Sequence, residues 1–187
     1  MKTTNSDIRV VVNGLDETGE ENGTSIATAI AKAIMSTVDM CLLPISLANP
    51  GVLSRTIIIA GKQIRLISSD KKDDKEDDKE NQPIPDIVDA PHVVIDCCDR
   101  SIMSRILDAC THSKTSFIET SPDVDQEEIK DSIWASGINA VIMPPVENIK
   151  EYAEKVVAAV RALFQREDDY VSAPYSQVFS GDDLLKA

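Results

Sequence analysis

Short aliphatic runs alternate along the chain with segments whose apolar residues recur every three or four positions, and this alternation constrains the fold more than any other feature. Buried strands are predicted at residues 8–12, 41–45, 92–96, 116–120 and 140–143. Helices are predicted to begin near Thr24 and Ser101 and to cover residues 126–135 and 146–166. Strands that alternate with such helices are joined by right-handed crossovers into a parallel sheet. The sequence therefore predicts an α/β fold, a Rossmann-like doubly wound parallel sheet in a single domain.

The core of this domain is expected to be aliphatic. Apolar residues make up 42% of the 187 residues and aromatic residues only 4%, and buried parallel strands are rich in Val and Ile. The clearest helix has one apolar stripe, formed by Ile149, Ala153, Val156, Val160, Leu163 and Phe164. A stripe of this kind indicates packing against the sheet.

Residues 55–86 interrupt the alternation. Two β-rich runs on either side of Gly61-Lys62 predict a hairpin. Between Asp70 and Glu80 lie seven acidic residues, four lysines and no apolar residue. Such a run cannot bury enough surface to offset its ordering entropy. Residues 69–86 are therefore predicted to form a mobile acidic loop, with docking to a basic partner as the alternative.

The end of the chain, from Asp168 to Ala187, has no clear period but contains Tyr170, Tyr175 and Phe179. We expect the domain to span residues 1–167 and the rest to form an extended tail. This tail is predicted to be either disordered or laid along a partner.

The net charge of −13 argues against a nucleic-acid partner, because neutralisation of phosphates supplies most of the non-specific affinity for nucleic acids. No stretch approaches the length of a membrane span. The first residues, "MKTTNSD", contain no apolar signal core. The protein is therefore expected either in the cytoplasm or in an organelle after removal of a targeting segment.

The four cysteines are Cys41, Cys97, Cys98 and Cys110. Their spacing fits neither a metal site nor a C-x-x-C redox motif, and the adjacent pair does not suggest a disulfide framework. We expect reduced, partly buried thiols.

Ligands of open α/β sheets bind at the carboxyl ends of the strands, so the loops after Val12, Ile95, Ile118 and Met143 are the candidate positions for a site. Asp96, Asp99 and Arg100 form the best polar cluster there, with helix capping or local pairing as the alternative role. The two histidines, His92 and His112, have no evident partner for acid–base chemistry.

Several segments together resemble the nucleotide-binding domain of plant-type dihydrodipicolinate reductases. The resemblance is carried, in order, by "IRVVVNG", "LPISLANPGVLSRTIIIAGKQIRLIS", "VVIDCCDRSIMSRILDAC", "SFIETSPD" and "NAVIMPP". It covers most of residues 8–164. It implies a Rossmann-like fold and an ancestral site for NAD(P)H.

The resemblance also implies that this cofactor site is degenerate. The family's turn of closely spaced glycines is replaced by Asn13-Gly14 followed at shifted spacing by Gly19 and Gly23. The same loop has four carboxylates, those of Asp16, Glu17, Glu20 and Glu21. Two like charges about 4 Å apart repel by roughly 1 kcal/mol in water and roughly 4 kcal/mol near a protein surface. Several such pairs would cancel the stabilisation of about 0.3–1 kcal/mol that a helix N-terminus offers an anion.

Two further family features are altered. The Gly-Thr-Thr-Gly segment beside the nicotinamide corresponds here to Glu119, Thr120, Ser121 and Pro122, so both flanking glycines are replaced. The family's substrate domain, with its His-His and Lys-x-Asp-x-Pro-Ser-Gly-Thr segments, has no counterpart after Phe164.

These features predict a non-catalytic reductase-like pseudoenzyme that serves as a protein-interaction subunit of a larger assembly. Its partners would bind the tail from Asp168 to Ala187 and the acidic run from Asp70 to Glu80, and the plant-type resemblance suggests a plastid, with the cytoplasm as the alternative. No cofactor is expected. The alternative is an NAD(P)H-binding regulator, or a reductase domain that works with a separate substrate subunit. The degenerate cofactor-binding residues are Asn13, Gly14, Gly19, Gly23, Asp96, Thr120 and Ser121.

Overall fold

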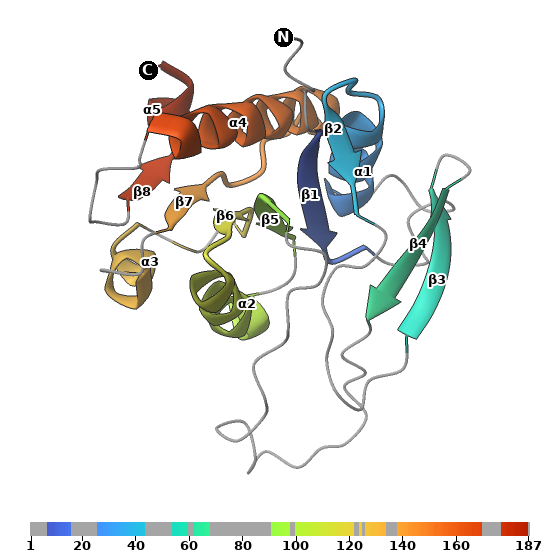
Figure 1. Ribbon diagram of the computed structural model, residues 1–187. Coiled ribbons are helices and arrows are strands. Elements are labelled where there is room, and N and C mark those ends of the chain that lie inside the picture. Colours follow the sequence, from blue (N-terminus) through green and yellow to red (C-terminus); the bar gives the residue numbers. More distant parts are fainter. Residues whose placement is uncertain are drawn as a thin grey trace, which may run out of the picture.

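Six parallel strands form the central sheet of the computed structural model (Figure 1), in the order β2-β1-β5-β6-β7-β8. The structure describes residues 7–15, 26–43, 54–59, 62–67, 91–97, 100–121, 124, 126–133, 138–169 and 177–186. The strands are β1 Ile8–Asn13, β2 Met40–Leu42, β5 Val93–Asp96, β6 Ser116–Glu119, β7 Asn139–Ile142 and β8 Gln177–Ser180. The predicted α/β, Rossmann-like parallel sheet is confirmed.

The direction in which the chain adds strands reverses between β1 and β5. From β1 the chain passes through α1 to β2 on one side, and it then returns to place β5 on the other side of β1. Strands β6, β7 and β8 are added outward from β5 in turn. In open α/β sheets, the carboxyl ends of the two strands at such a reversal form the usual ligand crevice.

Helices cover both faces of the sheet. Helices α1 (Ile26–Met35) and α4 (Ile149–Asp169) lie side by side on one face, and α2 (Arg100–Ser113) and α3 (Gln126–Ile133) lie on the other (Figure 1). Alternate strand residues enter two separate cores: Val10 and Val12 pack with α1 and α4, whereas Val11 packs with α2 and α3. This alternation follows from the two-residue period of a strand.

The expected apolar stripe of α4 is largely confirmed. Ala153, Val156, Val160 and Leu163 are buried in the core shared with α1, and Phe164 packs partly buried against it. Ile149 differs, because 38% of it is exposed at the start of the helix. It lies in the first turn, where α4 leaves the β7 loop.

The tail prediction is wrong for the described residues 177–186. Strand β8 pairs in parallel with β7, with Ala140 opposite Val178 and Val141 opposite Phe179. Helix α5 (Gly181–Lys186) then packs on α4 and buries Leu184. Ser180 caps this helix, because its Oγ accepts a hydrogen bond from the backbone N of Asp183 at 3.2 Å. The domain therefore continues past residue 167 to the end of α5.

The hairpin prediction is confirmed by β3 (Ser54–Ile59) and β4 (Lys62–Ile67), which pair antiparallel as a separate two-stranded sheet (Figure 1). The predicted acidic loop at residues 69–86 lies outside the described residues. Within the described ranges, none of the helices combines the length and apolar character that crossing a bilayer requires.

Candidate functional site

A row of polar residues crosses the carboxyl edge of the sheet at the reversal point. The register places Asn13 of β1 opposite Asp96 of β5, and Asp96 opposite Glu119 of β6. The preceding residues Val12, Ile95 and Ile118 all face the core shared with α1 and α4. Because side chains alternate along a strand, the three polar side chains face the α2 and α3 side together.

Asn13 and Asp96 are joined directly. The side-chain Nδ2 of Asn13 donates a hydrogen bond to Oδ1 of Asp96 at 3.0 Å. Asn13 is only 8% exposed and Asp96 is completely buried. The backbone continues the connection, because the N–H of Cys97 donates to the carbonyl of Asn13 at 3.1 Å. The strand ends are thus held together by both side chain and main chain.

Glu119 is a completely buried acidic residue beside this pair. Its Oε1 accepts a hydrogen bond from the backbone N of Ser121 at 2.7 Å, whereas its buried Oε2 has no hydrogen-bond partner among the residues that the structure describes. Burial, with the nearby charge of Asp96 as the second cause, raises the pKa of Glu119 to about 7. Near neutral pH this carboxyl group is therefore partly protonated.

A second layer lies one residue further along the strands. Thr120 donates from Oγ1 to the carbonyl of Asp96 at 2.9 Å, and its backbone N donates to the same carbonyl at 3.1 Å. Tyr152 reaches this layer from α4 and donates from its hydroxyl to the carbonyl of Met143 at the end of β7. The sheet edge is thereby tied to the helix above it.

The ionisable groups of this layer are held in their neutral forms. Burial raises the pKa of the Cys97 thiol to about 12, opposed by a hydrogen bond with Thr120 and assisted by the charges of Asp96 and Glu119. Burial likewise raises the pKa of Tyr152. A thiol in this setting is a poor nucleophile, because the thiolate is the reactive form.

The structure brings together four of the seven residues predicted for the cofactor site: Asn13, Asp96, Thr120 and Ser121. Each of them is buried. Gly14 follows Asn13 directly and has a backbone φ of 93°, a conformation that residues with a Cβ rarely adopt. Gly19 and Gly23 lie outside the described residues, as do Asp99 and the side chain of Arg100.

Both histidines lie away from this edge. His92 precedes β5 at the amino edge, where its Nδ1 accepts a hydrogen bond from the backbone N of Arg9 at 3.0 Å. Its ring packs edge-on against Phe164, with 4.9 Å between centroids, and burial lowers its pKa. His112 lies in the last turn of α2, with Nδ1 2.7 Å from the carbonyl of Asp108. Their contacts are local and structural.

The polar residues at the carboxyl edge form a buried, hydrogen-bonded layer and not an open site with reactive groups. Asn13 bonds to Asp96, Thr120 bonds to the Asp96 carbonyl, and one oxygen of Glu119 accepts from the Ser121 backbone. Each strand-end residue except half-buried Cys97 is buried. Within the described ranges, no three His, Cys, Asp or Glu side chains come close enough to hold a metal ion. Cys41, Cys97 and Cys110 are free thiols; Cys97 is half-buried and Cys110 is buried, whereas Cys41 is exposed, unlike the partly buried thiol that was expected.

Sequence reasoning missed two members of this site, Glu119 and Tyr152. Glu119 was expected only as a bulky replacement for a glycine, and its burial beside Asp96 depends on the register of β5 and β6. Tyr152 occupies a helix position four residues before Val156, on the buried face of α4. A tyrosine within the apolar stripe of this helix was the signal in the sequence that could have indicated a buried hydroxyl group.

The sequence matches no protein-family model and no curated protein.

Proposed function

We propose that this protein is a non-catalytic, dihydrodipicolinate-reductase-like domain that serves as a protein-interaction subunit of a larger assembly. The observation that carries the proposal is the complete burial of Glu119 at the carboxyl edge of β6. The resemblance places a glycine of the reductases here, beside the nicotinamide. A buried carboxyl side chain at this position replaces the close backbone approach that a glycine permits.

The hydrogen bonds of the edge support the same proposal. A reductase needs polar groups that face the cofactor and a proton donor within reach of the substrate. Here Asn13, Thr120 and the backbone N of Ser121 direct their hydrogen bonds to Asp96 and Glu119. The two histidines lie at the opposite edge or in the last turn of α2. The hydrogen bonds of Asn13, Thr120 and Ser121 therefore stabilise the carboxyl edge of the sheet and do not face a cofactor.

The loop after β1 adds an electrostatic argument from the sequence. Asp16, Glu17, Glu20 and Glu21 follow the turn at which a pyrophosphate would have to bind. Their carboxylates repel an anion. The net charge of −13 increases this repulsion over longer distances.

A second candidate function has one observation in its favour. The polar row lies at the reversal between β1 and β5, where nucleotides bind in sheets of this kind. An NAD(P)H-binding regulator, or a reductase domain with a separate substrate subunit, would use this position. Binding of NADPH or NADH by the isolated chain distinguishes it from the first candidate.

The location in a plastid belongs to the same proposal, because it rests on the resemblance to the plant-type enzymes alone.

The experiment that tests the interaction role is purification of the tagged full chain from its source at physiological salt, followed by size-exclusion chromatography with light scattering. We expect one or more partner proteins in fixed stoichiometry. Elution as a monomer at its natural concentration would contradict the interaction-subunit role.

A further inference from the structure

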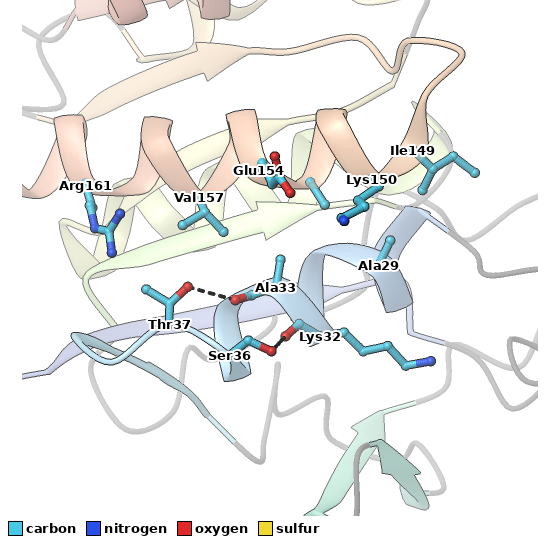
Figure 2. Close-up of a pocket in the computed structure, with 11 residues that line it drawn as sticks. Ala29, Lys32, Ala33, Ser36, Thr37, Ile149, Lys150, Glu154, Val157 and Arg161 are labelled. Atoms are coloured by element: carbon cyan, nitrogen blue, oxygen red, sulfur yellow. Dashed lines mark hydrogen bonds between the residues drawn. The ribbon is translucent and has the colours of Figure 1, made fainter.

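An open groove of about 780 Å³ lies between α1 and α4 on their outer surfaces (Figure 2). Its floor is made of small apolar side chains from both helices, including Ala29, Ala33, Ala153 and Val157. The exposed side chain of Ile149 lies at one end of the groove, and Arg161 lies at the other (Figure 2). The groove lies on the outside of the α1 and α4 layer, and none of its lining residues belongs to the polar row at the carboxyl edge of the sheet.

Cations line this apolar floor. Lys32 comes from α1, and Lys150 and Arg161 come from α4, whereas Glu154 is the acidic residue of the lining. Arg161 is held by Asp39, with Nε and Nη2 donating at 3.0 and 2.8 Å to the two carboxylate oxygens. Neither Lys32 nor Lys150 forms an ion pair within the described part of the chain. Three cations are thus set against the carboxylates of Glu154 and Asp39, which leaves an excess of one positive charge at the groove of a chain with a net charge of −13.

We propose that the groove binds an amphipathic helix of a partner protein, one with apolar residues on one face and Asp or Glu residues on its flanks. The inference rests on the proposed interaction role and assigns it a surface. Binding of such helices by apolar grooves is a recurring mode of recognition. The groove follows α4 from Ile149 to Arg161, a length of about 18 Å. About three turns of a helix fit along it.

Charge favours this occupant over a second copy of the same chain. In a two-fold contact through the groove, both facing surfaces contain Lys32 and Lys150, and both copies carry a net charge of −13. Like charges oppose such a contact. An acidic partner helix instead places carboxylates beside Lys32 and Lys150 and apolar side chains over Ala33 and Val157.

The test combines the native complex with a defined probe. In the native complex, the double variant Lys32→Glu/Lys150→Glu should lower partner recovery about tenfold or more. The matched control is the double variant Lys114→Glu/Lys130→Glu, which makes the same change of charge on the side of α2 and α3, and it should leave recovery unchanged. Equal recovery with the double variant overturns the groove assignment while the interaction role stands. Absence of any complex with the unaltered chain contradicts the proposed function itself.

The probe is a pair of fluorescent helical peptides with Leu at i, i+4, i+7 and i+11 and flanking Glu or, in the control, Lys. We expect the Glu peptide to bind the full chain at least about tenfold more tightly than the Lys peptide, with NMR shifts centred on Ala33 and Val157. Equal affinities, or shifts centred elsewhere, overturn the proposal. Concentration-dependent dimerisation through these residues would show a second copy to be the occupant and would overturn it as well.

Discussion

The side-chain amide of Asn13 donates a hydrogen bond to the carboxylate of Asp96 at 3.0 Å, and this contact joins the two strands at the point where the order of the sheet reverses. In a nucleotide-binding domain this is where the crevice opens. Here the two side chains are joined to each other in a buried position. The relationship indicates that the carboxyl edge stabilises the fold, which leads to the predictions below.

Asn13→Ala should lower the free energy of unfolding by about 1–3 kcal/mol, because a buried carboxylate oxygen loses its donor. Chemical denaturation measures this change. In an Asp96→Ala background the same substitution should cost much less, so the double-mutant cycle should give a coupling energy of about 0.5–3 kcal/mol. A coupling energy near zero would show that the contact contributes nothing to stability.

The pKa of Glu119 predicts how stability changes with pH. Its folded value of about 7 lies above its ordinary value of 4.5, so between these values the folded state binds more protons than the unfolded state. The free energy of unfolding should therefore fall as pH rises through this window, with a contribution from Glu119 of about 3 kcal/mol.

Glu119→Gln should remove this contribution, because the amide oxygen still accepts from the Ser121 backbone and no charge is buried. The variant should match the unaltered protein near pH 4.5 and exceed its stability by about 1–3 kcal/mol at pH 8. Denaturation curves across this range provide the measurement. The control is Glu147→Gln at an exposed position, and parallel curves for all three proteins would refute the role given to Glu119.

Leu184 and Leu185 form a matched pair on α5 that tests whether the end of the chain belongs to the domain. Leu184 is 3% exposed, whereas Leu185 is 38% exposed. Leu184→Ala should lower the free energy of unfolding by about 2–5 kcal/mol, and Leu185→Ala by no more than about 0.5 kcal/mol. Equal, small effects would favour the extended tail that the sequence predicts.

Tyr152→Phe should destabilise the fold by about 1–3 kcal/mol, because the carbonyl of Met143 loses its buried donor. In a domain of this size, each kcal/mol corresponds to a decrease in Tm of about 2–4 °C. Thermal unfolding followed by circular dichroism measures it. An unchanged Tm would mean that the hydroxyl contributes no net stability.

The elements that the sequence predicts well have either an unbroken aliphatic run or a long apolar stripe. The strands around Val11 and Val94 follow from aliphatic runs, and α4 follows from apolar residues at a fixed spacing. Strand β8 and helix α5 give neither signal, since "QVFS" is not an aliphatic run and six residues are too few to show a helical period. Their order comes from pairing with β7 and from the burial of Leu184.

The residues of the candidate site also fall into those that the sequence predicts and those that it does not. Asn13, Asp96, Thr120 and Ser121 could be predicted because carboxyl ends of parallel strands share one edge. The burial of Glu119 could not, because an isolated glutamate is ordinarily exposed. Only the register between β5 and β6 places it beside Asp96.

Titration of the full chain with NADPH, followed by backbone amide NMR, tests the account most directly. If the carboxyl edge is closed by Asn13, Asp96 and Glu119, millimolar NADPH should leave the amide signals of Gly14, Cys97 and Thr120 in place and the Tm unchanged. Saturable shifts of these signals would contradict the account. A stabilisation of about 2.7 kcal/mol at a hundredfold excess over the dissociation constant would contradict it equally.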